Sequence, residues 1–158
     1  MWQVFRINEL RVSVSIPPTL KRVDAGDSES PLAVGGGDTL AVFRSTLEGE
    51  PATDVPAEGC SIYIGIEDNS LGLPLAEWIL TQSYQRPEDV DEEIQLGGIT
   101  AIRRTGRGEI FGDPFTIVFV PHGAVIFTLT LEARGNNTVI EQCGQEFDQV
   151  VNSFHVGG

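Results

Sequence analysis

The sequence feature that most constrains the fold is a pair of apolar runs within residues Glu109 to Ala133, which meet at Pro121-His122-Gly123. In each run one set of alternating residues is wholly apolar and the other is mixed, which predicts the two strands of a long hairpin. Proline with a glycine two residues later favours a three-residue turn with a glycine bulge. That turn would pair Phe119 with Val125, so we expect the two wholly apolar faces to lie on the same side of the sheet.

The rest of the chain predicts further short strands and two helices. Period-two patterns and turn residues predict strands at 12–16, 21–23, 39–45, 60–66, 94–96 and 99–104. Residues Leu73 to Tyr84 have the apolar spacing of an amphipathic helix, and Val139 to Phe154 have the same spacing. Hairpin-linked strands with few helices indicate an α+β class: an antiparallel sheet of about six strands or more, flanked by helices on both faces as an α/β/α sandwich. We expect a single domain spanning residues 1–158.

The chain is strongly acidic, with 23 acidic and 10 basic residues and a net charge of −13. Such a charge repels phosphate backbones and anionic lipid, so binding to nucleic acid or to a membrane surface is disfavoured. No apolar run approaches the ~18–20 residues of a membrane span, and the N-terminus has no apolar signal-peptide core. Two interpretations stay open: a cytoplasmic protein, or a mature chain from which a signal and linker have been removed.

Two cysteines, Cys60 and Cys143, are too far apart for a CxxC motif. Cys60 shares a strand face with Ile62, and Cys143 lies on the apolar stripe of the last helix with Phe147. If that helix packs on that strand, the sulfur atoms can form a disulfide; the alternative is two unlinked buried thiols. The choice bears on the compartment, because disulfides persist in oxidising environments.

Residues for catalysis or cofactor binding are sparse, and we predict no catalytic, cofactor-binding or metal-binding residues. His122 at a hairpin tip and His155 near the C-terminus are poorly placed for a general base. Two histidines and two cysteines without a close ligand pair do not indicate zinc. The run Gly35 to Asp38 lacks the rest of a phosphate-binding loop and leads into a strand.

Acidic residues gather in two predicted loops, Glu88 to Glu93 and the segment with Asp24, Asp27 and Glu29. Neither has the ligand spacing of an EF-hand, so we interpret them as solvated carboxylates, with weak calcium binding as the alternative. The sequon beginning at Asn136 is interpreted as a turn.

Five segments follow one another in the order found in the PsbP-like superfamily: VSVSIPPTL, SIYIGIEDNSLGLPLAEWIL, IQLGGITAIRR, IVFVPHGAVIFTLTLE and EFDQVVNSF. The chain resembles this group over nearly its whole length. The group includes the photosystem II subunit PsbP, a Ran-binding nuclear import factor, DcrB-like proteins and bacterial lipoprotein domains. The resemblance implies an antiparallel sheet between helices, and a group whose members are mostly non-enzymatic, dock on other proteins or assist assembly, and share no catalytic residues. We expect no enzymatic activity and no cofactor.

Our first hypothesis is therefore a protein-binding or assembly module from the cell envelope, the soluble domain of an exported bacterial protein. We expect its partner to contact the loops Asp24 to Gly37 and Leu47 to Gly59, where binding variation collects. The aromatic residues most suited to a partner surface are Trp2, Tyr63, Trp78 and Tyr84, with core packing as the alternative for each. The second hypothesis is a cytoplasmic DcrB-like secretion chaperone that holds apolar client helices. A hydrolase or metal-dependent enzyme is a third class, and the oligomeric state is left open.

Overall fold

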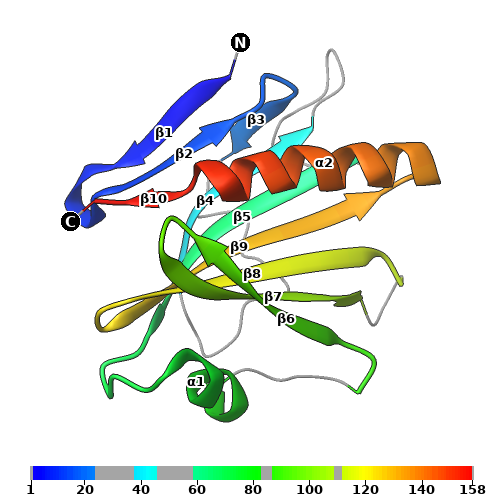
Figure 1. Cartoon of the computed structure of the whole chain (residues 1–158). Helices are drawn as coiled ribbons and strands as arrows, with labels where there is room; N and C mark the ends of the chain where they lie inside the picture. The colour runs from blue at the N-terminus through cyan, green and yellow to red at the C-terminus, as the bar shows by residue number, and fades with distance from the viewer. Residues whose placement is uncertain (1, 24–37, 46–58, 83–86, 109–111, 158) are drawn as a thin grey trace.

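A computed structural model describes residues 2–23, 38–45, 59–82, 87–108 and 112–157. Within these ranges seven strands form one antiparallel sheet in the order β3-β4-β5-β9-β8-β7-β6 (Figure 1). In chain order they are β3 (Leu20–Val23), β4 (Asp38–Ser45), β5 (Gly59–Asp68), β6 (Val90–Leu96), β7 (Ile99–Arg107), β8 (Pro114–His122) and β9 (Val125–Arg134). The β8–β9 hairpin lies inside this sheet, with β5 on one side and β7 on the other.

A second, smaller sheet joins the two ends of the described chain. It has the order β1-β2-β10 and is built from β1 (Gln3–Ile7), β2 (Val12–Ile16) and β10 (His155–Val156). A short 3-10 helix, η1 (Asn8–Leu10), connects β1 to β2 through Arg11, which has a left-handed φ of 54°. The sequence predicted β2 but not β1, because most of β1 is exposed and its apolar signal is correspondingly weak.

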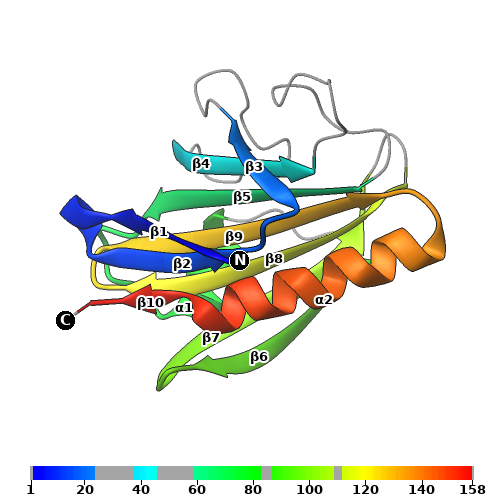
Figure 2. The ribbon, with the colours of Figure 1, turned by 90° about the horizontal axis from the view of Figure 1, so that it is seen from above.

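The two helices lie on opposite faces of the large sheet, which confirms the predicted α+β sandwich (Figure 1). Helix α2 (Asn137–Ser153) packs on one face together with the small sheet, and Figure 2 shows it lying at a small angle to β8 and β9. Its apolar stripe is buried as predicted and includes Cys143, Phe147, Val150 and Val151. Helix α1 (Leu75–Gln82) covers the other face with Trp78 and Ile79, which contact residues of β8. It begins later than predicted, because the residue before Pro74 is disfavoured in a helical conformation.

The register of the β8–β9 hairpin differs from the prediction. The strands are joined by the two residues Gly123 and Ala124, and Phe119 pairs with Thr128 instead of Val125. Gly123 has φ 59° and occupies the first central position, which suits a two-residue hairpin turn better than the predicted three-residue turn.

This register places the two wholly apolar faces on opposite sides of the sheet. Phe115, Ile117 and Phe119 lie in the core with α1. The residues of β9 predicted to join them, such as Phe127 and Leu129, lie in the core under α2. The prediction that the faces coincide was therefore wrong, and the hairpin is buried on both sides.

Strand β6 also differs from the prediction. We expected an acidic loop as far as Glu93, but the strand begins at Val90 and pairs with β7 along its whole length. Gly97 and Gly98, with φ 56° and 86°, form the two-residue turn between them. Two successive left-handed residues are the signature of a type I′ hairpin turn.

Candidate binding site

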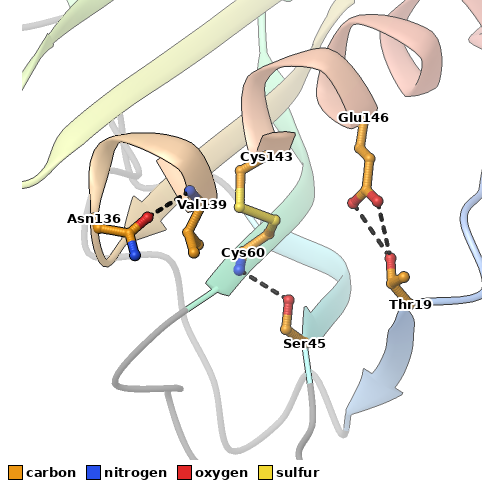
Figure 3. Close-up of a disulfide and its surroundings, with 7 residues drawn as sticks. All are labelled: Thr19, Ser45, Cys60, Asn136, Val139, Cys143 and Glu146. Atoms are coloured by element: carbon orange, nitrogen blue, oxygen red, sulfur yellow. Dashed lines mark hydrogen bonds between the residues drawn. A yellow bond between two sulfur atoms is a disulfide. The ribbon is translucent and has the colours of Figure 1, made fainter. Parts of the chain in front are cut away.

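Cys60 and Cys143 are joined by a disulfide that links the first residues of β5 to the middle of α2 (Figure 3). The S–S distance is 2.06 Å and the Cα–Cα distance is 5.6 Å. Both residues are buried. The bond connects positions 83 residues apart in the sequence, so it crosses from the large sheet to the helix that covers it.

Polar contacts hold α2 at both of its ends and near its middle. The Asn136 side chain accepts a hydrogen bond from the Val139 N–H at the N-terminus of the helix, and the Thr19 hydroxyl donates to Glu146 (Figure 3). Near the C-terminus the Ser15 N–H donates to the Ser153 hydroxyl at 2.8 Å. These contacts and the disulfide hold α2 against this face of the sheet.

On the opposite face, strands β4, β5 and β9 carry a group of polar side chains beyond the end of α1. The Arg44 guanidinium donates to the Tyr63 hydroxyl at 3.1 Å, and that hydroxyl is also hydrogen-bonded to Glu132. Burial raises the pKa of Glu132, while Tyr63, Arg134 and Arg44 lower it by smaller amounts. Burial likewise raises the pKa of Tyr63, which keeps the phenol protonated at neutral pH.

An ion pair between Arg104 and Asp91 anchors the edge strand β6. Arg104 on β7 is only 1% exposed and donates to both carboxylate oxygens of Asp91, at 2.8 and 3.1 Å. Its guanidinium also lies 5.4 Å from the centroid of the Phe119 ring. A bidentate pair of this kind fixes orientation, and it holds β6 in place against the core under α1.

A pocket of about 570 Å³ opens between α1 and strands β6, β7 and β8. Its apolar lining consists of Leu75, Ala76, Ile102 and Pro121. Its polar lining consists of Asp91, Glu92, Glu93 and Thr100. The volume is in the range of ligand-binding clefts, and the combination of an apolar floor with carboxylates makes this the candidate binding site.

Three large apolar side chains in or next to α1 and β6 are exposed to solvent. Leu80 on α1 is 79% exposed and Val90 on β6 is 62% exposed, and both belong to the elements that form the pocket. Leu71, just before α1, is 80% exposed. Scattered exposed apolar residues of this kind are ordinary on protein surfaces.

The residues that the sequence singled out for chemistry lie apart from one another. His122 is exposed at the end of β8, and His155 is exposed in β10. Within the predicted acidic loop Glu88 to Glu93, Asp91 and Glu93 share the pocket face of β6 and Glu92 lies on the opposite face, so the carboxylates are divided between the two faces of the sheet. In the part of the chain that the structure describes, no three histidine, cysteine or acidic side chains are grouped to hold a metal ion.

Two of the aromatic residues considered for a partner surface are core residues instead. Tyr63 is 3% exposed and Trp78 is 1% exposed, and the Trp78 indole N–H donates to the Asp68 carbonyl at 2.9 Å. Trp2 is half-buried against the core under α2. Tyr84 lies outside the described residues, as do 24–37 and 47–58 of the two predicted partner-binding loops and the acidic residues Asp24, Asp27 and Glu29.

The pocket itself was missed at the level of sequence, since its walls come from four elements that meet only in the folded protein. Charged groups outside the pocket lining did leave two signals in the sequence. Glu132 is the one acidic residue of a mostly apolar strand, which marks a buried carboxylate that needs partners. The pair Arg103-Arg104 in a period-two strand requires one arginine on each face; the structure places Arg103 with Asp148 of α2 and Arg104 in the opposite core.

No model of a known protein family matches the chain, and no curated protein sequence matches it. Solved structures do match. Cyanobacterial PsbP (CyanoP) from Synechocystis sp. PCC 6803 superposes with a TM-score of 0.63 at 15% identity, over 99% of this chain and 92% of CyanoP. The Saccharomyces cerevisiae Ran-binding protein Mog1p gives 0.56 at 14% identity, over 99% and 95%. LpqN, involved in cell envelope biogenesis of Mycobacterium tuberculosis, gives 0.53 at 14% identity, over 93% and 83%.

These matches define the fold: the chain is an α+β protein with an antiparallel sheet between two helices, of the PsbP/Mog1-like type. The predicted resemblance is therefore confirmed at the level of the fold. Within the ranges that the structure describes, no helix has the length and apolar character needed to cross a membrane.

Proposed function

We propose that this chain is a single PsbP-like domain, residues 1–158, that works as a non-catalytic protein-binding or assembly module in the cell envelope of a bacterium. The observation that carries the proposal is the disulfide between Cys60 and Cys143 inside a PsbP/Mog1-like fold. Structural disulfides of this kind persist in oxidising compartments and are rare in the cytosol. The similarity to LpqN supports the same compartment, since that protein is involved in cell envelope biogenesis.

The binding role is supported by the fold and by the pocket. Mog1p is a Ran-binding protein, so this fold presents protein-binding surfaces elsewhere. In this chain the pocket beside α1 combines an apolar lining with carboxylates. The groups with shifted pKa values, Tyr63 and Glu132, are hydrogen-bonded to each other inside the protein, which favours a structural role for them over a catalytic one.

The compartment is tested by the redox state of the cysteines in the native host. Cells are quenched with acid, and the protein is unfolded without reductant and treated with a maleimide carrying a large polymer. Two modified thiols would overturn the envelope assignment and favour the cytoplasmic chaperone. A chain that is modified only after reduction supports the proposal. The variant Cys60→Ala provides the control, because its single remaining thiol must react.

The binding role is tested by photo-crosslinking in the same cells. Lys21 is the only lysine in the sequence, so amine-reactive reagents are unsuitable and a photoreactive amino acid is placed at exposed positions across the surface. A defined crosslinked protein that is reproducible and depends on position supports the proposal. Absence of any position-dependent crosslink, or turnover of a small molecule by the purified protein, would contradict it.

A further inference from the structure

We propose that β6 and the adjoining pocket form a docking groove for an extended, positively charged segment of a partner protein, which adds to the large sheet as a further strand. This inference rests on the proposed protein-binding function and specifies where the partner binds and what chemistry it carries. Three features support it: the edge that β6 presents among the described strands, the pocket beside that edge and the charge of the pocket lining.

The edge of β6 presents backbone groups to an incoming strand. Among the described strands β6 is the last in the sheet and pairs only with β7. The two-residue turn makes Leu96 and Ile99 a hydrogen-bonded pair, and bonded and non-bonded pairs then alternate along the hairpin. Asp91, Glu93 and Gln95 fall in the non-bonded positions, so their backbone N–H and C=O groups point away from β7.

The pocket lies on the α1 side of the sheet, where alternate side chains of an added strand would also lie. Glu93 pairs with Ile102, and both line the pocket together with Leu75 of α1. Side chains directly opposite each other on paired strands lie on the same face. Every second residue of an added segment would therefore project toward α1, and the residue opposite Glu93 would enter the pocket.

The charge of the groove indicates which segment fits. Asp91 and Glu93 lie on the pocket face of β6 and contribute two carboxylates, whereas Glu92 lies on the opposite face beside Arg103. Arg104, which binds Asp91, supplies one compensating positive charge, so the groove keeps a net negative charge. A segment with lysine or arginine beside apolar residues would meet these carboxylates while burying an apolar side chain on the pocket floor. Strand addition of this type derives affinity from main-chain hydrogen bonds and specificity from alternate side chains.

A second copy of the chain is a poorer occupant of the same edge. Two β6 strands paired with each other would bring their carboxylates together, and like charges directly opposite one another are destabilising. Acidic residues on an edge strand also prevent aggregation, but that role requires no pocket beside the strand. The pocket is what distinguishes a docking groove from a merely protected edge.

The test uses the oxidised protein and a synthetic peptide of about ten residues that alternates threonine with lysine or valine, titrated to about 1 mM and followed by NMR. We expect chemical-shift changes confined to β6, β7 and α1. Hydrogen exchange of the Asp91, Glu93 and Gln95 amides should slow by about tenfold when the peptide is bound. The same peptide with glutamate in place of lysine should not bind.

Three variants separate the parts of the groove. Glu93→Pro removes an outward-facing N–H and places a ring at the edge without removing a β6–β7 hydrogen bond, so it should abolish binding. Ala76→Trp should fill the pocket and weaken binding while leaving the edge intact. Glu93→Gln should weaken binding by about two- to fivefold and reduce its salt dependence. The control is Glu141→Gln, the same change on an exposed turn of α2, which should have no effect.

The outcomes distinguish this inference from the proposed function. Shift changes on another surface, no binding at about 1 mM, or a β6-mediated dimer in solution would each overturn the docking groove. The photo-crosslinking experiment would still decide whether the protein binds a partner. If the Glu93→Pro chain fails to fold, as judged by Trp78 fluorescence, Ala76→Trp decides the test instead.

Discussion

The disulfide between α2 and β5 allows the most quantitative prediction. The comparison is between the oxidised protein and the same chain reduced, which differ only in the bond between Cys60 and Cys143. The bond closes a loop between positions 83 residues apart. On the chain-entropy model, closing a loop of this length in the unfolded state stabilises the protein by about 4.5 kcal/mol at 25 °C.

This is a large effect for a protein of this size. Single domains unfold with a free energy of only about 5–15 kcal/mol, so reduction should remove about 30% or more of the stability. For a chain of this length the corresponding fall in Tm is about 9–18 °C. The variant Cys60→Ala/Cys143→Ala should lose a further ~1–2 kcal/mol, because both sulfur atoms are buried and their removal leaves space in the core.

Urea unfolding followed by tryptophan fluorescence measures this difference. Trp78 is buried and hydrogen-bonded in the core under α1, so its emission reports loss of the native packing. The m-value should also be larger for the reduced chain, because an unfolded state without the cross-link exposes more surface. Unfolding free energies that agree within about 1 kcal/mol between the two forms would refute the loop-entropy reasoning.

Three further predictions concern single positions. Burial raises the pKa of Glu132, so the native state holds its proton more tightly than the unfolded chain and stability falls as pH rises through the native pKa. Glu132→Gln should remove that fall in urea titrations from pH 4 to 8, and an unchanged pH profile would count against the assignment. Gly106→Ala should destabilise the protein by about 1–3 kcal/mol, because its new methyl group would meet the Asp89 carboxylate. Gly144→Ala on α2, with open space around it, should stabilise the protein by about 0.5–1 kcal/mol. Equal effects of the two substitutions on the unfolding free energy would contradict the structure. Asn136→Ala should lower the free energy of unfolding by about 1 kcal/mol, because it removes the N-terminal cap of α2. The same urea unfolding assay measures this change, and an unchanged free energy would show that the cap is dispensable.

Patterns of the sequence that depend only on neighbouring residues predicted the local structure correctly. The stripe through Cys143, Phe147 and Val150 predicted the buried face of α2, and the alternation through Ile62 and Ile64 predicted the strand it covers. Because both patterns were right, the sequence alone was enough to consider the two cysteines as partners. The fold class followed from the order of the elements and their short connections.

Features that depend on a single turn or on tertiary contact could not be predicted with the same success. The predicted hairpin register was wrong. Both strands have enough apolar residues on each face to be buried in either register, so the apolar pattern could not distinguish a two-residue turn from a three-residue turn. The left-handed conformation of Gly123 determines the register of the hairpin. The pocket could not be predicted for a more general reason. Nothing in the sequence around Leu75, Ile102 and Pro121 indicates that these residues line the same pocket in the folded protein.

The two-sided burial of the β8–β9 hairpin has a consequence for mutational tolerance. In β2, buried and partly exposed residues alternate, so a scan of polar substitutions there should show tolerance at every second position. In β8 the six residues from Phe115 to Val120 are all buried, three toward each helix. The hairpin should therefore show no period of two in such a scan and should instead appear as a continuous intolerant block, which is the pattern expected of a membrane span or a fully buried parallel strand.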